Sequence, residues 1–284
     1  MIIRIRGTGQ HCWRAVKAWL LAAVVAVSAL MQTAMADTGR PTLTVGYAEF
    51  PPLEYLDDNN RAAGVFVELT RKVAEEAGFD LEFVYLPISR TYFYLKNGVI
   101  DLWPGLTQIP ELQGHVLESE TSPLPVQLSV WSLEGTPMAT RFESFHDRIL
   151  ILIAGYTYGG LREYLEQQDN IRLTYAPNHL AALYMLERNR GHYLLDYQHP
   201  VREVMKEYGI TGIQEQQVRT RYTSWLFSRQ NPDSHRLREA FDAAYRRLEA
   251  RGEVPPAITK DADYLLPGFP SIKDTLAPPS VLAD

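Results

Sequence analysis

Apolar positions along the chain first alternate and then recur at helical spacing, from about residue 43 onward. Leu43–Tyr47 alternates as a strand does, and residues 66–77 carry an apolar face with a three-to-four-residue period. Gly78 then ends the predicted helix. The elements that follow are a strand over 81–85, a short helix over 91–96 and a strand over 99–103. This strand–helix order indicates a parallel sheet.

A second unit of the same kind follows. Its predicted elements are strands over 148–154, 171–175 and 193–196, a glycine-containing loop over 155–160, and helices over 161–167, 179–188 and 201–208. Two extended runs, 127–133 and 223–227, lie between and after these units and suit a hinge, which concentrates a rotation in few residues. We therefore predict an α/β fold of two lobes joined by two hinge strands.

The N-terminal residues differ in charge and apolar content from the rest of the chain. Residues 1–19 hold four basic residues and no acid, an apolar run from Leu20 to Met31 follows, and Ala34-Met35-Ala36 supplies small residues at a cleavage site. This order predicts a secretory signal peptide cleaved after Ala36. The run of about a dozen apolar residues is short of the ~20 that a membrane-spanning helix needs. The predicted organisation is a signal peptide over 1–36, lobe 1 over 37–127 plus 224–266, lobe 2 over 128–223, and a C-terminal tail over 267–284.

Removal of the leader changes the charge and the thiol content. The remaining chain would have 24 basic and 34 acidic residues, a net charge of −10, and the only cysteine, Cys12, would be lost. An acidic protein is a poor partner for nucleic acid or an anionic membrane surface. The sequence has neither the Gly-x-Ser-x-Gly motif of a hydrolase nor a phosphate-binding Gly-x-x-x-x-Gly-Lys loop, and its histidines lack metal-binding spacing. We expect no metal, cofactor or nucleic-acid partner.

Candidate binding residues lie where the predicted strands end, because ligands bind at the carboxyl ends of parallel strands. Tyr47, Phe50 and Trp103 could form an aromatic wall for an amine or an apolar group, although ordinary core packing would also explain them. Thr157 and Tyr158 precede a helix, where backbone N–H groups suit an anion; a plain strand–helix turn is the alternative.

Two acidic residues of the first unit are weaker candidates for ligand binding. Glu54 could face a cleft but is expected at its rim. Asp101 is expected to accept backbone N–H bonds in a structural role.

Short motifs follow one another through most of residues 42–262: Leu43–Tyr47, Phe50-Pro51-Pro52, Gly64–Leu69, Asn97–Asp101, Gly105-Leu106-Thr107, Pro110-Glu111, Gly155–Gly159, Tyr193–Asp196 and Trp225–Ser228. Their order resembles that of the family 3 extracellular solute-binding proteins, the polar amino-acid type of periplasmic receptor. The resemblance implies the periplasmic-binding-protein-like type II fold, with a ligand held in the cleft between the lobes. It also implies an ABC importer as partner.

The same resemblance assigns roles to three further positions. An Asp near Asp196 pairs with the ligand's amino group in the family, although here it could instead cap the following helix or form a surface ion pair. Most amino-acid receptors of the family carry a Thr and a carboxylate-binding Arg where this chain has Ile109 and Leu112. Leucine cannot bind a carboxylate, so Arg90, which precedes the second helix, is the candidate substitute.

The sequence thus predicts a monomeric periplasmic protein that captures a small polar solute, an amino acid or related amine, for an ABC importer. Two alternatives remain open. One is a periplasmic enzyme on the same fold, similar to some dehydratases, which would need a positioned acid or base in the cleft. The other is a sensory binding protein with no transport role. An enzyme is not expected, because one carboxylate does not make a mechanism.

Overall fold

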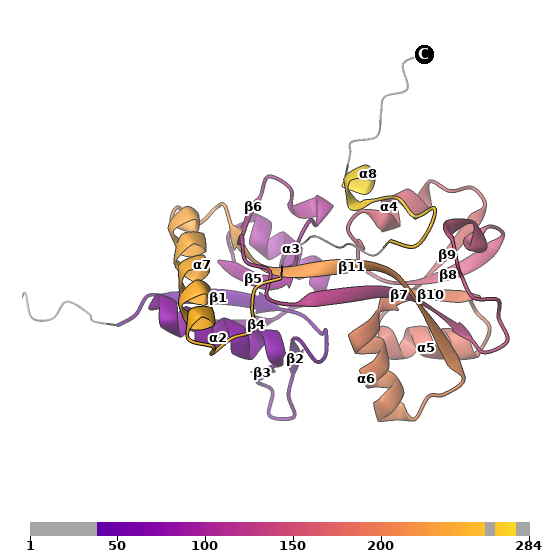
Figure 1. Cartoon of the computed structure of the whole chain (residues 1–284), viewed down its shortest axis with the longest axis horizontal. Helices are drawn as coiled ribbons and strands as arrows, with labels where there is room; N and C mark the ends of the chain where they lie inside the picture. Colours follow the sequence, from indigo (N-terminus) through magenta and orange to yellow (C-terminus); the bar gives the residue numbers. More distant parts are fainter. Residues whose placement is uncertain (1–38, 259–264, 277–284) are drawn as a thin grey trace, which may run out of the picture. The chain divides into compact units, whose positions relative to one another are not determined.

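One long sheet path connects all the main strands of the protein. A computed structural model describes residues 39–258 and 265–276, so the predicted signal peptide lies outside the described residues. The sheet runs in the order β4-β1-β5-β11-β7-β10-β8-β9, with β6 paired to β11 (Figure 1). The strands are β1 Thr42–Tyr47, β4 Asp80–Tyr85, β5 Leu102–Leu106, β6 Val116–Glu118, β7 Pro125–Leu133, β8 Arg148–Ile153, β9 Ile171–Ala176, β10 Tyr193–Tyr197 and β11 Ile213–Ser228.

The path divides into two α/β lobes, here defined by their elements. Lobe 1 contains β1, β4, β5 and β6, and lobe 2 contains β8, β9 and β10. Within lobe 1, β1 pairs in parallel with β4 and β5; within lobe 2, β8 pairs in parallel with β9 and β10. The lobe 1 helices are α2 Val65–Ala77, α3 Ile88–Lys96 and α7 Ser234–Ala250, and those of lobe 2 are α4 Leu161–Glu166, α5 His179–Glu187 and α6 Gln198–Tyr208.

Two long antiparallel strands, β7 and β11, join the lobes. Residues 213–222 of β11 pair with β7, and residues 223–227 pair with β5, so one strand belongs to both lobes. The fold class predicted from the sequence, two α/β lobes joined by two strands, is confirmed by this topology. The residues at which the lobes divide stay a prediction.

Several elements start or end away from their predicted positions. The third strand was expected over 99–103, but β5 runs to Leu106, so Trp103 lies near its start. Helices α3 and α6 each begin three residues early, at Ile88 and Gln198. The hinge run expected over 223–227 is the end of the sixteen-residue strand β11.

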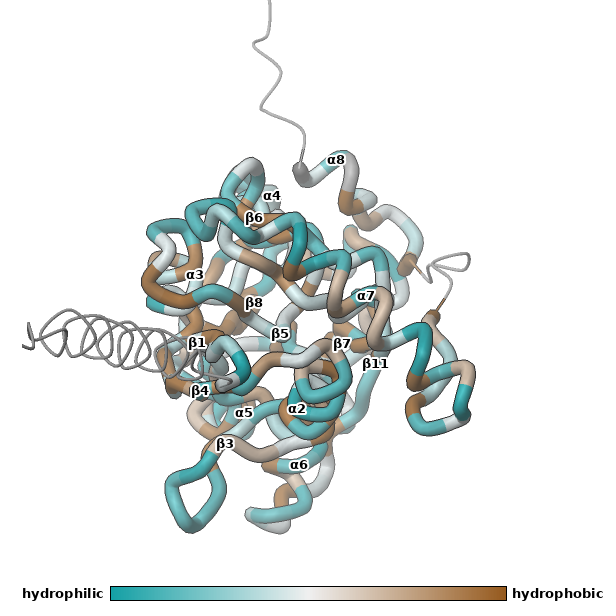
Figure 2. The backbone as a smooth tube through the Cα atoms, turned by 90° about the vertical axis from the view of Figure 1, so that its left-hand side faces the viewer, coloured by the Kyte–Doolittle hydropathy of each residue, from teal (hydrophilic) through white to brown (hydrophobic). Residues whose placement is uncertain are grey.

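Short elements complete the described chain. They are strands β2 Tyr55–Leu56 and β3 Ala62–Ala63, two 3-10 turns over Pro110–Leu112 and Phe142–Phe145, and helix α8 Ile272–Leu276. The loop between β2 and β3 is hydrophilic along its length (Figure 2), in agreement with its polar sequence over 57–61. No helix in the described part of the chain is long and apolar enough to cross a membrane.

The lobe 1 core shows why its helices form where they do. Phe66 of α2 and Phe241 of α7 both pack on Trp225 of β11, with ring centroids 5.6 and 5.9 Å apart. The Trp225 indole N–H donates to Thr70 Oγ1 at 2.9 Å, which satisfies its only polar atom inside the core. The apolar faces of α2 and α7 are therefore buried against the same strand.

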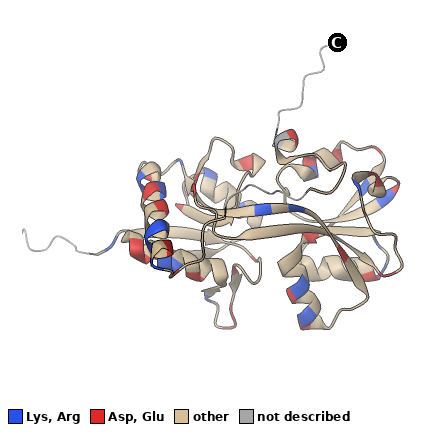
Figure 3. Ribbon diagram, viewed as in Figure 1, with Lys and Arg blue, Asp and Glu red and all other residues tan. Residues whose placement is uncertain are grey.

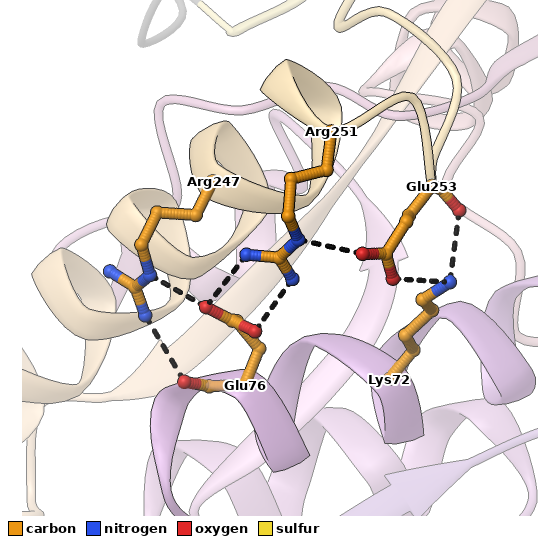
Figure 4. A network of polar contacts seen from close by, with 5 residues as sticks. All are labelled: Lys72, Glu76, Arg247, Arg251 and Glu253. Atoms are coloured by element: carbon orange, nitrogen blue, oxygen red, sulfur yellow. Dashed lines mark hydrogen bonds and ion pairs between the residues drawn. The ribbon is translucent and has the colours of Figure 1, made fainter.

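An ion-pair network holds the outer ends of α2 and α7 together (Figure 4). Arg247 and Arg251 donate to Glu76 at 2.7 and 2.8 Å, and Lys72 Nζ lies 3.1 Å from Glu253 Oε2. Hydrogen bonds from the two arginines lower the pKa of Glu76 to about 2. These groups are exposed or only half-buried, so the network orients the helices and adds little stability.

Polar side chains fix the junctions of lobe 1. Asp101 Oδ2 accepts a bond from the Thr44 backbone N–H at 2.9 Å, and Oδ1 accepts from Asn231 Nδ2 at 2.8 Å. The structural role predicted for Asp101 is confirmed. Asp242 of α7 is buried and accepts bonds from Ser119 and Thr121, which fixes the segment that leads into β7.

The C-terminal segment runs along lobe 2. Leu266 N donates to the Val218 carbonyl oxygen at 2.8 Å, and Phe269 is buried with its ring against Phe142 at 5.3 Å. Thr275 Oγ1 then donates to the Gly159 carbonyl oxygen at 2.7 Å. The described part of the predicted tail therefore packs against the protein as far as residue 275.

Candidate binding pocket

A pocket lies between the lobes, beside the point where β5 pairs with β11. It encloses about 510 Å³ of space outside the protein atoms, part of it open to solvent. Thr223 of β11 lines it between the two lobes. The lobe 1 lining consists of Ala48, Phe50, Leu53, Glu54, Phe66, Ile88, Tyr92, Trp103–Leu106 and Ile109, and the lobe 2 lining consists of Tyr156, Thr157, Tyr158 and Tyr197. Because both lobes line the pocket, rotation of one lobe would open or close it.

Aromatic rings form most of its wall and meet across the lobes. The ring centroid of Phe50 lies 5.2 Å from that of Tyr197 and 6.4 Å from that of Tyr156. On the lobe 1 side, Tyr92 packs edge-on against Trp103 at 5.3 Å. Burial raises the pKa of Tyr156 and Tyr197, so their hydroxyl groups stay protonated at neutral pH. The wall is apolar, with hydroxyl groups as possible donors.

Glu54 provides the pocket's carboxyl group. The residue is only 4% exposed, and Ala48 N and Trp103 Nε1 each donate to its Oε1 at 3.4 Å. Its other oxygen, Oε2, is buried and has no hydrogen-bond partner within the described part of the chain. Burial raises the pKa of Glu54 well above its usual value, because the long hydrogen bonds compensate little of the lost hydration. The expected rim position for Glu54 is wrong.

Four of the seven residues predicted to bind ligand line this pocket together. They are Phe50, Trp103, Thr157 and Tyr158. The Trp103 ring lies flat over Gly105, where a Cβ would come within 2.2 Å of it, so the glycine makes room for the ring. The Tyr158 hydroxyl accepts from Ile153 N at 2.7 Å and is turned into lobe 2. Ligand contact by these four residues stays a prediction.

The other three predicted residues lie outside the pocket lining. Tyr47 is buried in β1, where its ring packs edge-on against Phe83 and Tyr85 at 6.0 and 5.5 Å. Arg90 is exposed in the first turn of α3. Asp196 is fully buried at the end of β10. The structure therefore does not bring Arg90 and Asp196 to one site with Trp103.

Asp196 instead holds a buried histidine. Its Oδ2 lies 2.7 Å from Nδ1 of His179, and its Oδ1 accepts from Tyr197 N at 2.7 Å. Burial alone would lower the pKa of His179, but the charge of Asp196 and the hydrogen bond to it outweigh burial and raise it. On its other side, His179 Nε2 lies 3.4 Å from the Tyr156 hydroxyl, which is also 3.5 Å from the Glu49 carbonyl oxygen of lobe 1.

A second hollow lies between the lobes on the other side of Tyr156. It encloses about 830 Å³ outside the protein atoms, solvent included. Lobe 1 lines it with residues such as Glu49, Tyr85 and Ser89, and lobe 2 with residues such as Asn178 and His179. Burial raises the pKa of Glu49. Ala48, Ile88 and Tyr156 line both this hollow and the aromatic pocket.

A buried arginine from β11 lies between the loops behind the pocket. Arg221 is fully buried, and its Nη2 donates to the Thr107 carbonyl oxygen at 2.5 Å. Its Nη1 packs on Gly159, where a Cβ would lie 2.4 Å away. This arginine falls in the middle stretch of β11, which is coloured for basic residues in Figure 3. It joins a lobe 1 loop to a lobe 2 loop without lining the pocket.

Sequence reasoning missed Tyr92, Tyr156 and Tyr197 as lining residues and placed Glu54 only at the rim. The strand-end rule could have found two of them, because Tyr156 follows the buried strand β8 and Tyr197 is the last residue of the buried strand β10. Tyr92 faces the pocket from a helix, and Glu54 follows a cis Pro51-Pro52 turn. No periodic pattern marks these two positions.

The arrangement is one that can enclose a small molecule. An apolar wall with a few polar groups is the usual lining of a ligand site. Among residues 39–258 and 265–276, no three His, Cys, Asp or Glu side chains gather closely enough to hold a metal ion.

Structures with this arrangement of lobes and connecting strands are the type II periplasmic binding proteins, and this chain has their fold. The chain also matches the model for bacterial extracellular solute-binding proteins, family 3, over residues 43–260. It belongs to that family. No curated protein matches it.

Three solved structures illustrate the likeness. A histidine kinase sensor domain with similarity to periplasmic binding proteins aligns with a TM-score of 0.66 and 22% identity, over 76% of this chain and 93% of that one. An ancestral arginine-binding protein bound to arginine aligns with a TM-score of 0.64 and 18% identity, over 76% of this chain and 95% of that one. A substrate-binding protein of an ABC uptake transporter from Streptococcus pneumoniae, with bound histidine, aligns with a TM-score of 0.64 and 18% identity, over 75% of this chain and 88% of that one. At such identities the likeness is one of fold.

Proposed function

We propose that this protein binds a small solute in the pocket between its lobes and delivers it to an ABC importer from the periplasm. The observation that carries the proposal is the contact of Phe50 with Tyr156 and Tyr197 across the pocket, in a chain of the solute-binding family 3. A ligand that touches both lobes favours the closed arrangement by its differential affinity. The connecting strands β7 and β11 would carry the rotation.

A binding protein should change shape with its ligand and release the ligand unchanged. Native mass spectrometry of protein purified from its source identifies the bound molecule, and small-angle scattering with and without that molecule measures closure. We expect a smaller radius of gyration in the bound form. A ligand present at 100 times its dissociation constant should add about 2.7 kcal/mol of stability. Conversion of the ligand to a product on incubation would point instead to an enzyme.

Substitution of a pocket residue tests the site. Phe50→Ala removes one ring of the wall and should weaken binding by at least about tenfold, since burial of an aromatic ring contributes ~1.5–3 kcal/mol. Phe93→Ala is the matched control, because Phe93 is 58% exposed on α3 and does not line the pocket. Equal affinities of the two variants by calorimetry would contradict the placement of the site.

A sensory role is the second candidate, and the histidine kinase sensor domain among the similar structures favours it. The two roles differ in the partner that recognises the closed form. ATP hydrolysis by the reconstituted importer of the same bacterium should rise with the ligand-bound protein if the role is transport. A kinase whose phosphorylation responds to the ligand-bound protein, with an importer that does not respond, would support sensing.

A further inference from the structure

The unpartnered carboxyl oxygen of Glu54 is the strongest polar feature of the pocket. It lies on a residue that lines the pocket and is 96% shielded from solvent, and Oε2 has no hydrogen-bond partner within the described chain. A buried carboxyl oxygen left without a partner costs free energy, because its lost hydration is not replaced by a protein hydrogen bond. A ligand group that reaches Oε2 would remove that cost.

The rest of the lining limits which ligand group this can be. None of the described lining residues is Lys, Arg or His, so a ligand carboxylate would find no counter-ion there. Arg221 of β11 is buried behind the wall and does not line the pocket: its Nη2 donates to the Thr107 carbonyl oxygen, and its Nε and Nη1 have no hydrogen-bond partner within the described chain. The rings of Phe50, Tyr92, Trp103 and Tyr156 instead present faces and edges to the pocket, and aromatic faces attract cations.

We infer that the pocket selects a small organic amine, with its ammonium group paired to Glu54 and its apolar or aromatic body among the surrounding rings. The inference rests on the proposed binding function and names its ligand class. It separates this site from one that recognises a whole amino acid, which would need a cation for the α-carboxylate.

Binding of an amine should also move a proton. Burial raises the pKa of Glu54 and so favours its protonated carboxyl in the empty pocket, whereas an ammonium beside it favours the carboxylate. The proton that leaves Glu54 goes to solvent, and the amine keeps its own. Affinity for the amine should therefore increase as pH rises toward the pKa of Glu54 in the free protein. It should be constant above that value, as long as the amine stays cationic.

A set of ligands with one shared body tests the class directly. The probes are 2-phenylethylamine, 2-phenylethanol, 3-phenylpropionate and L-phenylalanine, with a second set built on a butyl chain. Thermal shift and calorimetry should show binding of the amines and at least about 30-fold weaker binding of the alcohol, acid and amino acid, as expected when a buried charge loses its partner. Calorimetry in two buffers of different ionisation enthalpy should show proton release on amine binding that decreases as pH rises.

Two variants connect the result to Glu54. Glu54→Gln keeps the shape of the side chain and should lose both the amine preference and the proton release. Glu82→Gln changes an exposed carboxylate on β4 and should alter neither. If the Glu54 variant folds poorly, Phe50→Leu should weaken the amines more than the alcohols, since it removes a ring face.

The outcomes also separate this inference from the proposed function. Tight binding of an amino acid or acid, unaffected by Glu54→Gln, would overturn the amine inference and leave a binding protein. The amine inference would equally fail if no amine of either set bound the wild type, or if the alcohols bound as well as the amines. Absence of any bound molecule from the native protein, with no closure in any ligand, would count against the function itself.

Discussion

Nδ1 of His179 lies 2.7 Å from Oδ2 of Asp196, so the carboxylate at the end of β10 binds a residue of its own lobe. Both side chains are buried, and the histidine in turn reaches Tyr156 between the two interlobe hollows. The carboxylate is thus already satisfied by a protein partner. Any ligand amine that used Asp196 would have to displace His179 first.

This pair should make stability depend on pH. The folded-state pKa of His179 is raised by Asp196, with a smaller contribution from Glu49, above the unfolded value of about 6.5. Its stabilisation is therefore complete below about pH 6.5 and is lost as pH rises through the folded-state pKa. Asp196→Asn should cost about 1.5–3 kcal/mol at pH 6, the range for hydrogen bonds to charged groups.

Denaturant unfolding of wild type and Asp196→Asn between pH 5.5 and 9 measures this effect. The difference in unfolding free energy should shrink as pH rises. An NMR titration of His179 in both proteins is the control, because the variant should titrate at lower pH. A difference that stays constant or grows with pH would show that the ion pair is not the cause.

Glu54 should also make the protein less stable as pH rises, in this case because its carboxyl group is buried. Burial raises its folded-state pKa well above the unfolded value of about 4.3. Relative to Glu54→Gln, the ligand-free wild type is therefore most stable below about pH 4.3. It loses stability as pH rises through the folded-state pKa, by at most about 1.4 kcal/mol per pH unit.

The comparison needs a carboxylate on the protein surface. Glu82→Gln removes the same charge from an exposed side chain, so the difference between the two variants isolates the effect of burial. Parallel curves for the Glu54 and Glu82 variants would mean that Glu54 is ionised and hydrated in the folded protein.

Most of the fold follows from local sequence patterns. The elements whose limits were predicted wrongly are strands that form because they pair with a neighbouring strand. The apolar faces of β1 and α2 are continuous in sequence, so their limits were predicted to within two residues. Strand β5 contains Pro104 and Gly105, which locally disfavour a strand, yet β5 forms because it pairs with residues 223–227 of β11. The polar first half of β11 is likewise a strand only because β7 lies beside it.

The site was predictable only where it follows the ends of strands. The rule placed Phe50 in the pocket lining, but it also selected Tyr47, which lies outside, and Trp103, which lines the pocket from near the start of β5. Thr157 and Tyr158 were found from the turn that precedes α4. The partner of Asp196, His179, begins a helix far along the chain, and no spacing rule links the two. The unpartnered state of Glu54 depends on what surrounds it after folding, which one sequence does not reveal.

Gly105 should be sensitive to the smallest enlargement. A Cβ there would lie 2.2 Å from the Trp103 ring, so Gly105→Ala must push the indole into the pocket or displace the strand. Overpacking of this kind costs about 1–3 kcal/mol. We also expect weaker ligand binding and altered tryptophan fluorescence. Unchanged stability and affinity in this variant would mean that the ring is free to move without filling the pocket.

Gly159 should be sensitive for two reasons that can be separated. Its φ of +66° is in the left-handed region, and a Cβ would lie 2.4 Å from Nη1 of Arg221. Gly209→Ala is a matched control, because Gly209 has a φ of +64° and nothing within 4 Å of its Cβ position. The control should show the conformational cost alone, about 1–2 kcal/mol. Gly159→Ala should cost more, since it also displaces Arg221 from the Thr107 carbonyl oxygen.

The excess cost should depend on the arginine. In an Arg221→Met background the clash with the guanidinium is gone, so Gly159→Ala should cost no more than Gly209→Ala does. Urea unfolding of the four proteins gives the coupling free energy of the cycle. Because Arg221 joins a loop of each lobe, the same substitution should also change how far the lobes close in scattering. Additive costs in the cycle would show that Gly159 is required only for its backbone conformation.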